Sequence, residues 1–210
     1  MKSKKWFEIF IIILICGTIT ITCNFNDDDE TNESKKITID GWTWSASNDK
    51  GDGGISTITM TQGADEDDKK ITIKGNVSKV LDVNKHFGYV DLQGTPNNTI
   101  LNNLKTADGI KFGHLGDGKK YVVEVRTSDI EDLSHYRYIL NTLNQYSPLT
   151  ILYEELQTPG WGESQNIPFD KNNITTINFQ ATWEDTLGGN LEVIEGPYEL
   201  TVWNLTPWKN

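Results

Sequence analysis

Apolar and polar side chains alternate along Ile55-Ser56-Thr57-Ile58-Thr59-Met60-Thr61 and again along Ile71-Thr72-Ile73-Lys74-Gly75. Successive side chains of a β-strand point to opposite faces of the sheet, so a period of two indicates a strand with one buried face. Clusters of Gly, Asp or Asn follow these runs, as tight turns between strands require. The alternation therefore predicts antiparallel strands.

The same pattern extends over the chain from residue 37 onward. Short helical turns are expected only at residues 101–106 and 129–133, because no segment keeps a helical period over three turns. About ten short strands at this spacing predict an all-β domain over residues 37–210, folded as a two-layer antiparallel β-sandwich. The further expected strands are residues 37–39, 87–92, 109–112, 121–127, 136–142, 150–156, 175–183 and 198–205.

The strongest turn signal is Gly116-Asp117-Gly118, which stands between a strand ending near Phe112 and one starting at Tyr121. Glycine adopts positive φ without steric cost, and an Asp side chain bonds its own backbone in a tight turn. We therefore expect the two flanking strands to form a hairpin.

The first 22 residues have the order of a secretory signal peptide. Three lysines precede the apolar run at residues 9–15, and small residues then lead to Cys23. The apolar part is about fourteen residues long, shorter than the roughly twenty that a spanning helix needs. This order resembles a bacterial lipoprotein signal, and the resemblance implies that Cys23 is acylated and holds the protein on a membrane of the cell envelope. Ordinary cleavage and an uncleaved anchor are the alternatives.

Residues 23–36 follow the signal and contain a run of four acids, Asp27-Asp28-Asp29-Glu30, but no aliphatic periodicity. Such a segment buries too little apolar area to offset its chain entropy, so we predict a disordered tether. A second acidic cluster, Asp65-Glu66-Asp67-Asp68, lies between two predicted strands. We interpret it as a solvated hairpin tip rather than a cation site.

Charge and cysteine content narrow the function. Without residues 1–22, 16 of the 19 basic and 29 of the 30 acidic residues remain, which gives a charge of about −13. Such a surface repels phosphate backbones and disfavours nucleic acid as a partner. Cys23 is then the only thiol, so neither a disulfide nor a cysteine nucleophile is expected in the domain. The histidines His86, His114 and His135 are scattered and favour structural roles.

Several strings together resemble the complex I intermediate-associated protein family and the family 11 carbohydrate-binding modules, both galactose-binding-like jelly rolls. The resemblance covers about residues 38–206 and implies a jelly-roll sandwich. The matching strings are Ser47-Asn48-Asp49, Gly53-Gly54-Ile55-Ser56, Phe87-Gly88-Tyr89, Ala107-Asp108-Gly109-Ile110-Lys111-Phe112, Gly116-Asp117-Gly118-Lys119-Lys120-Tyr121, Arg126-Thr127, Tyr136 with Leu140 and Thr142, and Asn166-Ile167-Pro168-Phe169.

Aromatic residues are the strongest indication of a ligand, because flat rings stack on pyranose faces while amides and carboxylates bond the hydroxyls. Trp161 lies in the Pro- and Gly-rich loop at residues 158–162, where an indole is at least partly exposed. Trp183, near a strand end, is the second candidate ring. Trp42 and Trp44 are expected in the core, and Trp203 is a further core candidate.

The strand at residues 136–142 supplies the other candidate ligand residues. Tyr136, Tyr138 and Leu140 share one face of this strand, and Arg137 and Asn141 share the other. Only one of the two sets lines a groove, and the sequence leaves open which one.

Three functions remain open from the sequence. The first is a lipid-anchored, non-catalytic domain that binds a neutral glycan. The second is an envelope interaction or assembly protein that uses the same fold to bind a protein partner. The third is a hydrolase, for which Glu154, Glu155, Glu184 and Asp185 are candidates by residue type alone. We predict no cofactor, no metal site and no catalytic residues.

Overall fold

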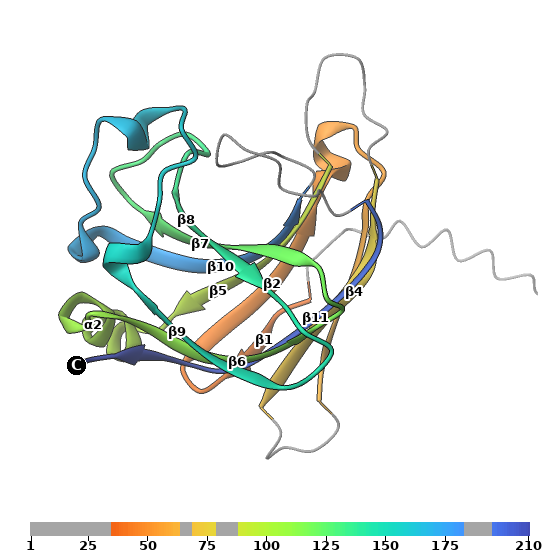
Figure 1. Cartoon of the computed structure of the whole chain (residues 1–210), viewed down its shortest axis with the longest axis horizontal. Helices are drawn as coiled ribbons and strands as arrows, with labels where there is room; N and C mark the ends of the chain where they lie inside the picture. Colours follow the sequence, from red (N-terminus) through yellow and green to blue (C-terminus); the bar gives the residue numbers. More distant parts are fainter. Residues whose placement is uncertain (1–34, 64–68, 79–87, 183–194) are drawn as a thin grey trace, which may run out of the picture. The chain divides into compact units, whose positions relative to one another are not determined.

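A computed structural model of the chain describes residues 35–63, 69–78, 88–182 and 195–210. Two antiparallel sheets are stacked face to face (Figure 1), and the predicted two-layer β-sandwich is confirmed. The signal peptide, Cys23 and nearly all of the predicted tether lie outside the described residues, as do Trp183 and the acidic cluster at residues 65–68. Within the described ranges, no helix is long and apolar enough to cross a membrane.

The first layer is a six-stranded sheet in the order β1-β2-β5-β10-β7-β8. Its strands are β1 (Ile37–Ile39), β2 (Trp42–Asn48), β5 (Tyr89–Pro96), β7 (Lys120–Thr127), β8 (Tyr136–Asn141) and β10 (Ile174–Thr182).

The second layer is a five-stranded sheet in the order β3-β4-β11-β6-β9. Its strands are β3 (Thr57–Gln62), β4 (Lys70–Val77), β6 (Gly109–Gly116), β9 (Ser147–Leu152) and β11 (Gly196–Trp208). Short 3-10 helices occupy the connections: η1 (Asp49–Asp52), η3 (Tyr153–Glu155), η4 (Glu163–Gln165) and η5 (Lys171–Asn173).

Aromatic rings hold the two layers together. The rings of Trp42 and Trp44 are 6.0 Å apart, and Phe112 of the second sheet meets Phe179 of the first edge to face at 5.1 Å. The indole Nε1 of Trp42 donates to the carbonyl oxygen of Leu205 at 2.9 Å, which ties β2 to β11. Burial of these rings is the main driving force for stacking the sheets, and the prediction that Trp42 and Trp44 are core residues is confirmed.

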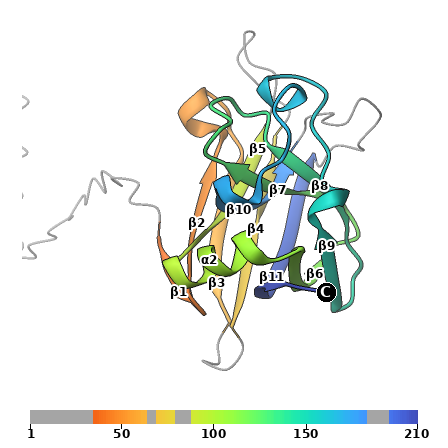
Figure 2. The same ribbon diagram turned by 90° about the vertical axis from the view of Figure 1, so that its left-hand side faces the viewer.

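The α-helix of the described part of the chain, α2 (Asn98–Thr106), lies across an end of the sandwich (Figure 2). Asn97 caps it, accepting at Oδ1 from the Ile100 amide at 2.9 Å, and Leu104 is its one fully buried residue. The helical turn predicted at residues 101–106 is therefore confirmed as part of a longer helix. Residues 129–133 contain no helix, and residues 153–155 form η3 rather than the end of a strand.

The turn at Gly116-Asp117-Gly118 does not close a hairpin, so that prediction is wrong. β6 pairs with β11 and β9, whereas β7 pairs with β10 and β8, so the turn carries the chain from one sheet to the other. Gly118 has the expected positive φ of 84°, and Asp117 Oδ1 accepts from the Lys119 amide at 3.2 Å. The local turn chemistry is as expected, and only the strand pairing differs.

Candidate functional site

The outward face of the six-stranded sheet carries a layer of polar side chains. Register places these side chains in straight rows across the strands, since the side chains of paired residues lie on the same face. The central row is Ser45, Gln93, Asn178, Glu124 and Arg137. The row on one side is Ser47, Asp91 and Gln180, continued by the apolar Val122 and Ile139, and on the other side Thr43 pairs with Thr95 and Thr176 with Arg126.

Ionic hydrogen bonds join these rows into a network. Glu124 accepts from Arg126 Nε at 2.6 Å with Oε1, and from Arg137 Nε at 3.1 Å with Oε2. Asp91 Oδ2 accepts from Arg126 Nη2 at 3.2 Å and from Asn178 Nδ2 at 2.6 Å. We call these five residues the polar network. It contains two carboxyl and two guanidinium groups.

The polar network is buried although it lies on an outward face. Glu124 is 1% exposed and Asn178 is fully buried, and Arg126 keeps about a quarter of its side chain exposed. Buried charges must be paired and hydrogen-bonded, because their desolvation otherwise costs several kcal/mol per ion. Such a network is rigid, so its remaining donors and acceptors have fixed directions for a ligand.

Asp91 has unused bonding capacity within this network. Among the described residues, its Oδ1 atom is buried without a hydrogen-bond partner. Burial raises the pKa of Asp91 from 3.8 to about 7, against the opposing effect of Arg126. Near neutral pH the carboxyl group therefore exists in both forms, so Oδ1 either accepts from a ligand hydroxyl or, when protonated, donates to one.

Trp161 lies beside the network because its loop pairs with the sheet edge. Arg137 and Gln157 exchange two backbone hydrogen bonds, at 2.7 and 2.8 Å, which extend the sheet beyond β8 by one bridge. Trp161 follows Gln157 by four residues, and the centroid of its ring lies 5.7 Å from the guanidinium carbon of Arg137, within cation–π range. The half-buried ring therefore flanks the polar network.

A second loop, between β7 and β8, fixes the conformation of the Trp161 loop. Asp132 Oδ2 accepts from the Glu163 amide at 3.0 Å, and Ser134 Oγ accepts from the Ser164 amide at 3.1 Å. Gly162 adopts φ +74°, and a Cβ there would lie 2.4 Å from Ser134 Cβ, so only glycine fits between the loops.

The site residues predicted from the sequence do not all lie on the same face of the sheet. Arg137 and Asn141 face outward with the polar network, and Trp161 joins Arg137. Tyr136 and Tyr138 face the sandwich interior, because they pair with the core residues Val125 and Val123.

Of the two open sets on β8, the outward one is therefore that of Arg137 and Asn141. Tyr136 is buried, and its hydroxyl donates to the Ile167 carbonyl at 2.6 Å. We remove Tyr136 and Tyr138 from the proposed ligand set for this reason. Trp183 lies outside the described residues.

Four network residues were missed in the sequence: Asp91, Glu124, Arg126 and Asn178. A signal for them exists, since each interrupts an apolar strand at an outward position and Glu124 and Arg126 are opposite charges two residues apart. Charged residues at alternate positions of a strand share one face of the sheet. A solvated edge strand has the same pattern, so the pattern alone does not indicate a buried network.

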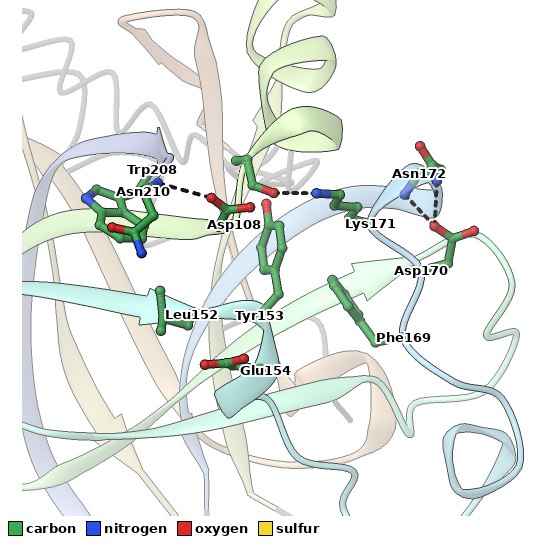
Figure 3. Close-up of a pocket in the computed structure, with 11 residues that line it drawn as sticks. Asp108, Leu152, Tyr153, Glu154, Phe169, Asp170, Lys171, Asn172, Trp208 and Asn210 are labelled. Atoms are coloured by element: carbon green, nitrogen blue, oxygen red, sulfur yellow. Dashed lines mark hydrogen bonds between the residues drawn. The ribbon is translucent and has the colours of Figure 1, made fainter.

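A separate hollow of about 520 Å³ lies where β9, η5 and the end of β11 meet. Figure 3 shows Tyr153 at its centre, with Asp108 on one side and Asp170 on the other. Asp108 accepts from the Asn210 amide at 3.1 Å, Asp170 accepts from the Asn172 amide at 2.9 Å, and the Tyr153 hydroxyl donates to the Leu104 carbonyl at 3.2 Å. These polar groups stabilise local backbone.

The carboxylates suggested for a hydrolase do not form a site in the described part of the chain. Glu154 lines the hollow of Figure 3, whereas Glu155 Oε2 accepts from the Leu152 amide at 2.7 Å and caps η3. Glu184 and Asp185 lie outside the described residues. Among the described residues, no group of three or more His, Cys, Asp or Glu side chains is arranged to hold a metal ion.

The six-stranded face of this two-layer sandwich thus carries fixed polar groups and a flanking indole. The family model for complex I intermediate-associated protein 30 matches residues 24–202. The match covers most of the chain, which belongs to this family.

Solved structures share the fold. A family 11 carbohydrate-binding module of the Clostridium thermocellum cellulase Lic26A-Cel5E aligns with TM-score 0.52 and 11% identity over 84% of this chain and 95% of that chain. The same organism's module in complex with a β-1,3-1,4-mixed-linked tetrasaccharide aligns with TM-score 0.50 and 12% identity over the same shares. At these identities the likeness shows the jelly-roll fold, as the sequence predicted.

Endoglucanase 3 of Fibrobacter succinogenes is 26% identical to the chain over 171 residues. The match covers 79% of this chain but 24% of the endoglucanase, so the chain spans about a quarter of that enzyme's length.

Proposed function

We propose that this protein binds a neutral glycan, without turnover, on the outward face of its six-stranded sheet. The observation that carries the proposal is the polar network, in which Asp91 Oδ1 has no partner among the described residues. A sugar hydroxyl both donates and accepts, so it matches a carboxyl group that exchanges a proton near neutral pH. The half-buried Trp161 supplies an apolar surface for the C–H face of a pyranose.

The relatives indicate which glycan to test first. The family 11 module with the same fold was solved with a β-1,3-1,4-mixed-linked tetrasaccharide, and the matching region of the Fibrobacter protein is part of an endoglucanase. We therefore propose a β-glucan chain as the ligand class. In this account the domain holds the polysaccharide and does not cleave it.

Gln180 provides a direct test, because it lies on the binding face, is half-exposed and makes a long contact of 3.5 Å with Glu124. Gln180→Ala removes one ligand hydrogen bond, worth about 0.5–1.5 kcal/mol, so the dissociation constant for the tetrasaccharide should rise about two- to tenfold. Calorimetric titration measures this change. Gln62→Ala, which removes the same side chain from an exposed position of β3, is the matched control and should bind as the wild type does.

Two results would redirect the proposal. If no glycan binds at millimolar concentration while a protein co-purifies with the chain from membranes, the interaction or assembly function replaces glycan binding. If reducing sugar is released from the β-glucan by the wild type but not by Glu154→Gln, the protein is a hydrolase.

We further propose that Cys23 is acylated and anchors the domain to a membrane of the bacterial cell envelope. The order of charged, apolar and small residues before Cys23 supports this. Labelled palmitate should enter the wild type and fail to enter Cys23→Ser. Cys16→Ser, which changes the other cysteine of the chain, is the control and should label normally. Equal labelling of the wild type and Cys23→Ser contradicts the anchor.

A further inference from the structure

The outward face of the five-stranded sheet carries an indole that lies flat on the backbone. Trp203 of β11 pairs with Gly113 of β6, and Gly113 pairs with Pro148 of β9. A Cβ at Gly113 would lie 2.1 Å from Cε2 and 2.4 Å from Nε1 of Trp203, so the ring covers the position that any other side chain would fill. The prediction that Trp203 is a core residue is therefore wrong, since the half-buried ring rests on the outside of the sheet.

A β-bulge directs several side chains of β11 to this face. Trp203 pairs with Gly113 and Thr206 pairs with Lys111, so Asn204 and Leu205 together lie opposite one residue of β6. Asn204 takes the extra position with φ +52°. The bulge keeps Leu205 in the core while Trp203 and Thr206 both point outward, three residues apart. Bulges commonly re-aim side chains in this way and are frequent beside functional sites.

A second ring stands against the indole. Tyr146, in the loop before β9, is 60% exposed, and its ring meets that of Trp203 edge to face at 5.1 Å. The ammonium group of Lys70 lies 4.9 Å from the Tyr146 centroid and 6.0 Å from that of Trp203. These cation–π contacts restrain both rings, so the aromatic surface is ordered.

The rings border a hollow of about 420 Å³, within the usual range for small-molecule sites. Its lining combines aromatic rings with polar side chains, which suits a pyranose with two apolar faces and a rim of hydroxyls. Hydroxyl, amide and ammonium groups are all present on the walls. The hollow is lined by, among others, Lys111, Tyr146, Pro148, Trp203, Asn204 and Thr206.

We propose that this hollow is a second sugar site, in which a pyranose unit stacks on Trp203 and Tyr146 and bonds to Asn204 and Lys111. The proposal rests on the proposed function for the ligand class, but it uses none of the residues of the polar network. The two sites lie on opposite outward faces of the sandwich, because Trp203 belongs to the five-stranded sheet and the network to the six-stranded one. One molecule would thus hold two glycan chains.

Fluorine NMR of the protein labelled with 5-fluorotryptophan tests the two faces separately, since each tryptophan gives its own signal. Signals are assigned with Trp203→Phe and Trp161→Phe. On titration with the mixed-linked tetrasaccharide, the Trp203 signal should shift and saturate. In Tyr146→Ala the sugar concentration that half-saturates the Trp203 signal should rise roughly tenfold, as expected for loss of one aromatic anchor. Leu143→Ala, which truncates a side chain that is 53% exposed in the same loop, should leave it unchanged.

The outcomes distinguish this inference from the proposed function. A Trp203 signal that titrates while the Trp161 signal stays still supports the second site and contradicts the first. A Trp203 signal that does not move at millimolar sugar overturns the second site, whatever Trp161 does. A titration of Trp203 that is identical in the wild type and in Tyr146→Ala also overturns it, because the exposed ring would then make no contact with the sugar.

Discussion

The two outward faces of this sandwich carry different kinds of side chains. On the six-stranded sheet, two carboxylates, two guanidinium groups and an amide are bonded to each other, and all but Arg126 are buried. On the five-stranded sheet, two rings and a lysine form a partly exposed surface over a glycine. The first face is a fixed set of polar partners, and the second is an apolar surface with polar groups at its border.

This difference has a consequence for stability. Removal of a group from the buried network leaves its charged partner without compensation, whereas removal of an exposed ring costs only its own contacts. Mutations in the network therefore affect stability as well as the proposed ligand site, so each of them needs a measurement of folding as a control. On the five-stranded sheet, loss of a ring proposed to bind the ligand should leave the fold stable.

The largest effect is expected for Glu124→Ala. Glu124 is the shared acceptor of Arg126 and Arg137, so its loss removes one carboxylate from each guanidinium group, and the Arg137 group is nearly buried. The free energy of unfolding should fall by about 3–5 kcal/mol. Urea unfolding measures it. The matched control is Glu199→Ala on the other sheet, an exposed glutamate whose removal should change stability by less than about 0.5 kcal/mol; similar losses in both variants would end the contrast between the faces.

A smaller effect is expected for Trp161→Ala, and it concerns affinity rather than folding. The half-buried ring lies over the Arg137 guanidinium group, and the fold should tolerate its loss because the ring is only partly buried. Affinity for the tetrasaccharide should fall by roughly 1–3 kcal/mol, about ten- to a hundredfold, if the ring anchors the sugar. Calorimetry measures the affinity and thermal unfolding checks the fold. Unchanged affinity would remove Trp161 from the site.

The pH dependence of stability should differ between the wild type and Asp91→Asn. Burial raises the folded-state pKa of Asp91 from 3.8 to about 7, so the folded protein binds this proton more tightly than the unfolded chain. The contribution of Asp91 to stability is then fully present below pH 4 and is lost as the pH rises through about 7. Asn does not titrate.

The free energy of unfolding of the wild type, relative to that of Asp91→Asn, should therefore fall by at least about 1 kcal/mol between pH 4.5 and pH 8. Urea unfolding of both proteins at the two pH values tests this. A relative stability that rises with pH would mean that the ion pair with Arg126 outweighs burial and holds the pKa low.

The smallest effect is expected from salt. A neutral sugar displaces no counterions, so its affinity for either face should be nearly the same at 50 mM and 500 mM sodium chloride, about twofold at most. Titration at both concentrations checks this. A steep loss of affinity with salt would point to a charged ligand and would shift attention to Lys70 and Lys111 on the five-stranded sheet.

Much of the fold was readable from the sequence, because strand periodicity is a local property. The alternating runs gave β3, β4 and most other strands, and α2 was expected near its observed place. The hairpin at Gly116-Asp117-Gly118 was predicted wrongly, since a turn that joins paired strands and one that crosses between sheets use the same residues. The choice of partner strand depends on β10 and β11, which lie far away in the chain.

The candidate site was readable only in part. Alternation showed that Tyr136 and Arg137 lie on opposite faces of β8, but the orientation of β8 is set by its register with β7. Arg137 and Trp161 were named from sequence for different reasons, and the bridge at Gln157 that brings them together leaves no local mark. Trp203 was expected in the core from the strand pattern. The bulge at Asn204 and the glycine at position 113 on the neighbouring strand allow its ring to lie on the outer surface of the sheet instead.

The most direct test of glycan binding on the six-stranded face is the NMR titration of the nitrogen-15-labelled protein with the mixed-linked tetrasaccharide, followed through side-chain amide signals. Gln93, Asn178 and Gln180 lie on the proposed face, and Gln62 lies on the other sheet. The account predicts that the signals of the first three shift and saturate together while that of Gln62 does not move. If all four stay unchanged at millimolar sugar, or if only Gln62 shifts, the six-stranded face does not bind the glycan.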